Sequence, residues 1–598
     1  MKLDELKAAL TMERVLCRLV AAWLSFAALI AMKALGFWEI EYISDPGLLS
    51  GCVGIGALFL LYTAVAVWVK SYPTDSWFLL LGAAACSGRW ILTYDAEQDR
   101  RFLMTLAIIA VDALVVAYFI RQNGEWLQKW QPGNRTLVIF TAACAVTACT
   151  VISIIGCLRY KTFSTPNYDF GLFCNMFHNM RETGLPLATS ERDKLLSHFA
   201  VHISPIYYLL LPFYWIFPSP MTLQIGQAAL VCLGVIPAVL LAKHFRLSGK
   251  ACMLVALIYC FYPVLSGGCF YDIHENCFLP LCLLLTFYFF EKEKYPLMYL
   301  SALAVLAVKE DAAIYLLIFA VYVFLSRRKY AHGTILAVAS LTYFLLATYL
   351  INTVGDGVLS NRFSNLIANE ESGLGGIIGL ALYNPGYLLT QIFTTAKGGW
   401  EKIYYFLMML LPLGLIPFFT KKASRWLLIA PILINLLSYY TYLYDPGFQY
   451  HFGVIAFLIY ATVQNLGDLQ APTRRQLLGF AATACCCLYL FLVVPKMNTY
   501  VDRWKDHKQT YIRMEEILDQ LPEDASLNVS SFLLAHVSDR EEVYEVAYHG
   551  DAPDVDFVVL DKRYSSYEKT ALAYEKQGYT VYADYDNLIL ILQKGEGA

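Results

Sequence analysis

Charge is scarce in this chain of 598 residues. Asp, Glu, Lys and Arg make up 16% of it, against about 25% in soluble globular proteins. Hydrophobic residues make up 58%, and the mean hydropathy is +0.51. This composition excludes an ordinary soluble protein. Apolar runs of roughly 20 residues recur from Leu16 to Val494, and each is long enough to cross a bilayer, so the sequence predicts a polytopic membrane protein.

Several sequence signals are missing, and each absence excludes a class of protein. Without a basic stripe, nucleic acid is not expected as a partner. The chain has 16 cysteines, but no CxxC pair, and most lie inside apolar runs, where cysteine behaves as a small hydrophobe. Residues 500–598 contain no cysteine and no glycine-rich phosphate loop. No small-residue cleavage site follows the charged N-terminus, so the first apolar run is interpreted as a retained anchor.

Lysine and arginine near the ends of the apolar runs set the expected orientation, because cytoplasmic loops are rich in these residues. The N-terminal segment is basic (Lys2, Lys7) and is placed inside. If the proline-rich run 202–220 lies along the outer interface instead of crossing, the later basic loops all fall inside. These loops are 243–250, 291–294, 326–329, 420–425 and 473–475. We therefore expect about fifteen membrane segments and a folded outer loop over 158–219.

The chain divides into three expected parts. Residues 1–130 form a four-helix membrane module, 131–499 a membrane domain that includes the outer loop, and 500–598 a small extracytoplasmic α/β domain. In the last part, 503–521 has the apolar spacing of an amphipathic helix. Short strand-like runs follow, with a helical segment between the third and the fourth (SLNVSS, EEVYEVA, DFVVLD, TVYADY and LILILQK).

Unusual polar residues gather in the loops that this orientation places outside. They are YDIHEN (271–276), KED (309–311), the long segment 353–400 and YDPGFQYH (444–451). The apolar stretch before Lys309 is too short to span at 1.5 Å per residue. A broken or re-entrant helix is tolerated only where protein or water shields its backbone. We therefore expect an outward-facing cavity; ordinary solvated loops are the alternative for any single residue.

The segment just after the fifth span surrounds one carboxylate, Asp169, with aromatic residues. A carboxylate in partly apolar surroundings suits a general base. His198 and His202 are four residues apart, which is also metal-ligand spacing, so a divalent cation stays open as a cofactor, although no third ligand is dictated. Lys309 either holds an anionic group such as a lipid phosphate or pairs with a neighbouring carboxylate, Glu310 or Asp311.

These motifs carry a resemblance. NYDFGLFCNMFHNMRETG, the HISP segment, YDIHENCFLP, AVKEDAA and FQYHFGV occur in this order, and together they resemble the bacterial membrane-protein family of domain of unknown function 2079 (DUF2079). The resemblance runs from about residue 136 into the C-terminal domain, and the first four spans look like an added module. That family is in turn similar to the GT-C glycosyltransferases, such as the protein mannosyltransferases and the lipid A arabinosyltransferases.

The resemblance implies a function. GT-C enzymes transfer a sugar from a polyprenyl-phosphate donor on the outer side of the membrane, and their first outer loop carries an essential acidic residue, here Asp169 by position. This chain departs from the pattern in having no paired Asp-Glu at that point. We expect substrate to be bound by His198, His202, Asp272, His274, Glu275, Lys309, Glu310, Arg362, Tyr450 and His451. No metal ligand is assigned.

The expected partners are a polyprenyl-phosphate-linked sugar, an unidentified acceptor and the bilayer of the bacterial cell membrane. The N-terminus is expected in the cytoplasm and the C-terminal domain outside it. The alternative is a transporter or flippase of lipid-linked or small anionic substrates. Transporters usually show internal repeats around a midplane site, whereas this sequence shows no repeat and its polar groups lie toward one face. An assembly protein with a vestigial site is a third interpretation.

Overall fold

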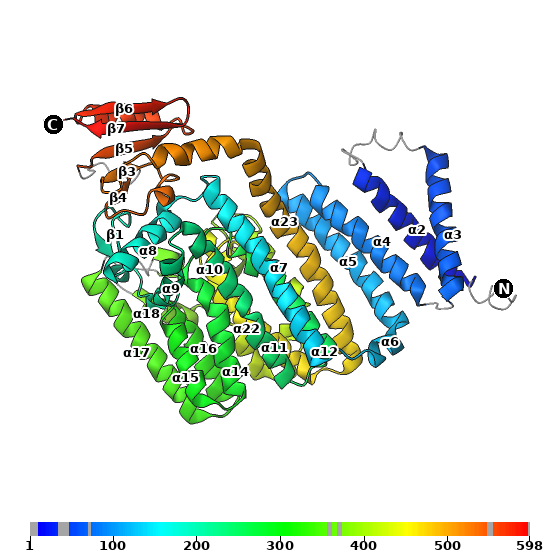
Figure 1. The fold of residues 1–598 in the computed structure, drawn as a ribbon. Helices are drawn as coiled ribbons and strands as arrows, with labels where there is room; N and C mark the ends of the chain where they lie inside the picture. Colours follow the sequence, from blue (N-terminus) through cyan, green and yellow to red (C-terminus); the bar gives the residue numbers. More distant parts are fainter. Residues whose placement is uncertain are drawn as a thin grey trace.

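Helices make up most of the structure, and a small five-stranded sheet stands at one end of the helical body (Figure 1). The computed structural model describes residues 10–33, 47–69, 73–355, 361–367, 373–396, 398–546 and 554–595. Lys2 and Lys7, used above to orient the chain, lie outside these residues. The predicted fold class, a helical membrane protein with a small C-terminal α/β domain, is confirmed.

The N-terminal module consists of α2 (Met12–Lys33), α3 (Leu48–Val69), α4 (Thr74–Thr93), α5 (Gln98–Gln122) and the short α6 (Gly124–Lys129). A buried arginine joins its helices: Arg18 Nε lies 2.8 Å from Asp75 Oδ1, and Arg18 also donates to the Thr63 hydroxyl. A charge inside a membrane helix is costly unless it is paired, so this ion pair fixes how α2 faces α4.

The membrane domain begins with α7. Its helices are α7 (Asn134–Lys161), α10 (Pro220–Leu233), α11 (Val235–His244), α12 (Gly249–Cys260), α13 (Pro263–Gly267), α14 (Leu279–Glu291), α15 (Tyr295–Leu306), α16 (Ala312–Leu325), α17 (Tyr330–Val354), α18 (Gly373–Tyr383), α19 (Pro385–Phe393), α20 (Glu401–Leu410), α21 (Pro431–Leu437), α22 (Phe452–Asp468) and α23 (Ala471–Leu518). Within the described ranges, 8 helices are long and apolar enough to cross a membrane, and α15 and α16 are shorter apolar helices. The expected number of about fifteen segments stays a prediction.

The segment between α7 and α10 forms a folded cap at one end of the helices. It contains the π-helical turn η2 (Asn167–Gly171), α8 (Leu172–Thr183), the hairpin β1 (Leu187–Ala188) and β2 (Leu196–Ser197), the 3₁₀ turns η3 (His198–Ala200) and η4 (Pro205–Leu209), and α9 (Leu211–Ile216). The basic turn 243–250 lies at the opposite end. There Lys250 Nζ donates to the Leu127 carbonyl, and Gly249 packs against Pro132. The structure thus separates the two segments, as the predicted orientation requires.

The helix α23 links the membrane helices to the C-terminal sheet. It contains Pro495 and bends at His507, whose φ of −124° is not helical. The expected boundary between 499 and 500 falls within this helix. The apolar core of the small domain includes Tyr511 and Met514 from the part of α23 beyond the bend, so that part belongs structurally to the sheet.

The C-terminal domain is a five-stranded sheet with strand order β4-β3-β5-β7-β6. Its elements are β3 (Leu527–Val529), β4 (Val543–Glu545), β5 (Phe557–Asp561), α24 (Tyr567–Glu575), β6 (Tyr579–Tyr585) and β7 (Ile589–Lys594). The structure therefore has all five predicted strands and the predicted helix between the third and the fourth.

This domain docks on the cap. Asn175 Nδ2 donates to the Arg540 carbonyl (2.9 Å), the Thr189 hydroxyl donates to the Val543 carbonyl (2.9 Å), and Phe163 stacks on His536 with ring centroids 3.7 Å apart. The cap and the C-terminal domain therefore lie at the same end of the membrane domain (Figure 1).

Candidate active site

Asp169 lies on the π-helical turn η2, a rare conformation that occurs frequently at functional sites. The C-terminal domain supports this turn. Asn167 donates from its backbone N–H to Ser531 Oγ (3.1 Å) and from Nδ2 to Glu545 Oε2 (2.8 Å). At Gly171 a Cβ would lie 2.8 Å from the Leu534 side chain, so glycine permits this close approach.

A cavity of about 520 Å³ opens beside Asp169. The predicted site residues that line it are Asp169, His198, His202, His274, Lys309, Arg362 and Tyr450. They come from the cap, the loop before α14, the turn between α15 and α16, and the loops before α18 and α22. The structure brings these distant side chains to one cavity, and their chemical roles stay predictions.

A chain of charged groups runs from the cavity into the protein. Asp169 Oδ1 lies 3.2 Å from His274 Nε2, an ion pair outside hydrogen-bonding geometry. His274 Nδ1 lies 3.3 Å from Glu275 Oε2, and Lys309 Nζ donates to Glu275 Oε1 (2.7 Å). The hydroxyl of Tyr207 donates to Glu275 Oε2 (2.8 Å). Glu275 therefore fixes both the imidazole and the ammonium that border the cavity.

The charges of this network support one another. Burial opposes the charged form of His274, but Asp169 and Glu275 outweigh it and raise the pKa of His274 to about 9. Burial alone would raise the pKa of Glu275, but Lys309 and His274 hold it well below its usual range. Burial likewise opposes the charge of Lys309, and Glu275 nevertheless raises the pKa of Lys309. At neutral pH, an imidazolium and an ammonium thus flank a buried carboxylate.

The pKa of His202 is shifted in the opposite direction from that of His274. Burial, together with the Lys309 ammonium, lowers the pKa of His202 to about 4, so this ring is neutral at pH 7. His202 Nδ1 lies 2.9 Å from Glu310 Oε1, and the backbone N–H of Ile203 donates to Glu310 Oε2 (3.2 Å). A neutral ring that donates from Nδ1 keeps Nε2 as an acceptor. His202 is therefore suited to orient a substrate hydroxyl.

Aromatic side chains form one wall of the cavity. Tyr271 and Phe448 have ring centroids 4.7 Å apart, and Tyr442 lies 4.4 Å from Phe448. The Arg362 guanidinium lies 4.9 Å from the centroid of the Tyr450 ring, which is within the range of a cation–π interaction. Arg362 Nη1 is 4.0 Å from Asp311 Oδ2, a long ion pair that leaves the guanidinium beside the cavity.

Some predicted site residues do not line the cavity. Glu275 and Glu310 lie behind it as the partners of Lys309 and His202. Asp272 is buried and accepts from Arg159 Nη2 (3.1 Å). Its φ of 146° is unusual for a residue other than glycine, and such strain persists only where the surroundings enforce it. His451 Nε2 lies 2.7 Å from the Val264 carbonyl. Asp272 and His451 thus have internal partners.

Other lining residues were not among the predicted site residues, although Tyr168 is one of the aromatic residues expected around Asp169. They include Asn167, Tyr168, Glu191, Arg192, Tyr271, Tyr440, Tyr442, Phe448 and Gln449. Tyr440 and Tyr442 have a sequence signal in retrospect, because tyrosines cluster at 439–450, at and just before the predicted YDPGFQYH motif. The polar pair Glu191 and Arg192 has none, since charged residues in a loop are ordinarily solvated.

The two histidines with metal-ligand spacing have separate partners. His198 Nδ1 lies 3.1 Å from Glu191 Oε2, whereas His202 contacts Glu310. Among the residues that the structure describes, no group of three or more His, Cys, Asp or Glu side chains is arranged to hold a metal ion.

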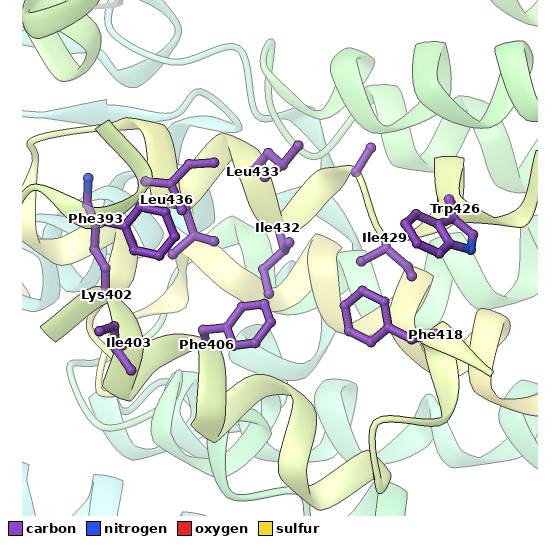
Figure 2. A pocket seen from close by; sticks show the side chains of 12 residues that line it. Phe393, Lys402, Ile403, Phe406, Phe418, Trp426, Ile429, Ile432, Leu433 and Leu436 are labelled. Atoms are coloured by element: carbon purple, nitrogen blue, oxygen red, sulfur yellow. The ribbon is translucent and has the colours of Figure 1, made fainter. Parts of the chain in front are cut away.

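A second hollow, of about 620 Å³, is almost wholly apolar (Figure 2). Figure 2 shows Phe406 and Ile432 between Phe393 at one end and Trp426 at the other. Of the described residues in its lining, Lys402 alone is charged, and its Nζ donates to the Gln391 carbonyl (2.6 Å). The helix α21, which supplies part of this lining, ends at Leu437, shortly before Tyr440 and Tyr442 of the Asp169 cavity. Adjacent parts of the chain therefore line the two hollows, and we call the second one the apolar groove.

Comparison with known proteins places the chain in a family. The model of "Predicted membrane protein (DUF2079)" matches residues 159–590, and no curated protein matches. Among solved structures, the chain is similar to ArnT from Cupriavidus metallidurans bound to undecaprenyl phosphate, with 12% identity, a TM-score of 0.48, and 78% of this chain and 99% of that chain covered. It is also similar to the apo state of that protein, with 12% identity, a TM-score of 0.43, and 76% and 97% covered.

Proposed function

The chain belongs to the DUF2079 family of membrane proteins, and from this premise and the geometry of its cavity we propose that it is a membrane glycosyltransferase. It transfers a sugar from a polyprenyl-phosphate donor to an acceptor hydroxyl. The observation that carries the proposal is that one cavity is lined by Asp169, by the two cations Lys309 and Arg362, and by aromatic side chains.

Asp169 is the general base of this reaction. The acceptor oxygen forms a bond to the anomeric carbon of the sugar, and the bond from that carbon to the phosphate oxygen breaks. The acceptor proton passes to Asp169, and the bonding electrons leave with the lipid phosphate. The imidazolium of His274 lies 3.2 Å from Asp169 and pairs with this carboxylate. His202, with Nε2 as an acceptor, orients the attacking hydroxyl.

Lys309 and Arg362 stabilise the leaving phosphate, and electrostatic stabilisation of this kind usually contributes more to catalysis than any other single effect. Lys309 uses one N–H on Glu275, and an ammonium has three donors. The guanidinium of Arg362 is held over the Tyr450 ring and offers several N–H donors. Sugar rings pack on the tyrosines of the wall. The neighbouring apolar groove of Figure 2 suits the isoprenoid chain of the donor.

The reaction takes place on the outer face of the bacterial cell membrane. The basic turns of the membrane domain, such as 243–250, lie at the end opposite the cavity, and basic loops stay in the cytoplasm. The end opposite the cavity also favours an enzyme over a flippase, because its helices are held together there. Tyr460 and Arg327 donate hydrogen bonds to Glu291, which joins α14, α22 and the α16–α17 turn.

The test is a release assay. Purified protein in nanodiscs is given a set of polyprenyl-phosphate hexoses and pentoses together with membrane extract as the source of acceptor. We expect free polyprenyl phosphate to appear with one donor and only when extract is present. Transport of a lipid-linked donor across proteoliposomes, without any release of lipid phosphate, would contradict the proposal and support the flippase.

A further inference from the structure

We propose that a second lipid site, specific for an anionic glycerophospholipid, lies between the N-terminal module and the membrane domain at the end opposite the Asp169 cavity. Two adjoining hollows of about 370 and 840 Å³ form it, and they share the lining residues Ile120, Gln128 and Arg475. We call this surface the basic groove.

Four cations line the basic groove: Arg121, Lys250, Arg474 and Arg475. Its lining includes no Asp or Glu among the residues that the structure describes. Three of the cations donate to backbone carbonyls: Lys250 to Leu127, Arg474 to Leu466 (3.4 Å) and Arg475 to Ala471 (3.4 Å). Nothing in the described lining neutralises the positive charge, so the groove is complementary to an anion.

Helix dipoles add to this charge. The helix α12 begins at Gly249 and α23 begins at Ala471, so Lys250, Arg474 and Arg475 lie within the first five residues of these helices. A helix N-terminus carries partial positive charge, which disfavours cations and favours anions. Two such ends and their cations in one groove repel one another until an anion binds between them.

The position and the apolar lining identify the anion as a phospholipid. The groove lies where α5 ends and where α12 and α23 begin, at the level of the turns near α6 (Figure 1). Apolar side chains also line the groove, with Leu127, Leu254 and Leu478 among them, beside uncharged polar residues such as Gln128 and Ser248. An acyl chain covers such a wall while the phosphate meets the cations. Basic pockets between transmembrane helices bind anionic headgroups in this way.

The lipid has a structural role in this arrangement. Arg121 and Leu127 belong to the N-terminal part of the chain, which the family match at 159–590 does not include, whereas Lys250, Arg474 and Arg475 belong to the matched part. A bound headgroup therefore bridges the two parts. It stabilises their contact without touching the reacting groups of the Asp169 cavity.

The test compares lipids on the purified, delipidated full-length chain. Native mass spectrometry counts the bound lipid, and tryptophan fluorescence follows thermal unfolding. We expect phosphatidylglycerol to bind and raise the Tm, and phosphatidylcholine and inorganic phosphate to do neither. R474Q/R475Q should weaken phosphatidylglycerol binding by roughly tenfold or more, because each Lys or Arg near an anionic headgroup contributes about 1 kcal/mol.

The matched control is K505Q/K508Q, which removes two exposed cations from the other end of the same helix and should leave binding unchanged. If R474Q/R475Q fails to fold, R121Q/K250Q tests the same groove from its facing walls. Equal binding of phosphatidylcholine, a full Tm shift with inorganic phosphate alone, or unchanged phosphatidylglycerol binding in the folded groove variants would each overturn the proposal.

Discussion

Two buried ionic networks hold the two ends of the membrane domain, and they differ in what they face. At one end, Glu275 joins His274 and Lys309, and both of these cations line a cavity. At the other end, Glu291 accepts from Arg327 Nη2 (3.1 Å) and from the Tyr460 hydroxyl (2.5 Å). The first network therefore presents its cations to an open space, whereas the second uses its donors within the protein.

The difference separates a structural cluster from a site. Both networks bury a carboxylate, and both include a histidine, since His244 Nε2 lies 3.4 Å from Glu291 Oε2. Burial and pairing alone therefore do not identify function. The end with Asp169 also has a π-helical turn and Asp272 at a φ of 146°, whereas the positive φ values in the turns near Glu291, at Arg246, Glu293 and Arg328, are 52° to 58°. Strain of this kind is concentrated at functional sites.

The largest effect is expected at Asp169. Asp169→Asn keeps the size of the side chain but removes its ability to accept a proton, so turnover should fall by roughly 10²-fold or more. Release of lipid phosphate by purified protein measures this loss. The control Asp502→Asn, on the exposed face of α23, should keep full turnover. An Asp169→Asn protein with near-normal turnover would make the carboxylate structural and remove the contrast between the two ends.

The same type of change at the other end should affect stability alone. Glu291→Gln weakens the charged hydrogen bonds from Arg327 and Tyr460, which should cost roughly 2 kcal/mol. Thermal unfolding in detergent should show a lower Tm, while turnover per folded molecule stays at the wild-type value. A loss of turnover without a change in Tm would mean that this network also takes part in the reaction.

Replacing Arg362 should weaken lipid-phosphate binding more than it lowers the stability of the protein. The reason is that its only carboxylate contact among the described residues, to Asp311, is long (4.0 Å). Arg362→Gln removes a charged donor from the cavity and should weaken binding of undecaprenyl phosphate by roughly tenfold. Microscale thermophoresis or native mass spectrometry measures the affinity. Arg513→Gln, which alters an exposed arginine of α23, serves as the matched control. Equal affinities in the two variants would place the phosphate elsewhere.

The smallest effect concerns pH. The pKa of His274 is raised from 6.5 to about 9 in the folded protein, so its ion pairs contribute stability that is fully present below pH 6.5. That contribution is lost as the pH rises through about 9. The Tm should therefore fall between pH 6.5 and 9, and His274→Gln should flatten this part of the profile. A profile with the same slope in wild type and variant would contradict the assignment.

The helices and strands were predictable because local patterns encode them. Apolar runs predicted the membrane helices, and short strand-like runs predicted the strands of the C-terminal sheet. The contacts of the site depend on tertiary structure instead. Lys309 pairs with Glu275, 34 residues away, and not with Glu310 or Asp311 beside it. Asn167 meets Glu545, 378 residues away. The local spacing of residues in the sequence does not predict such contacts, because only the folded structure brings the partners together.

The position of the lipid phosphate tests the proposed reaction most directly. A cryo-electron microscopy structure of the protein in nanodiscs with undecaprenyl phosphate would locate it. We expect phosphate density within hydrogen-bonding distance of Lys309 or Arg362, beside Asp169, with the isoprenoid chain leaving toward the apolar groove. Phosphate density bound elsewhere, with the Asp169 cavity free of it, would contradict the proposed reaction at this site.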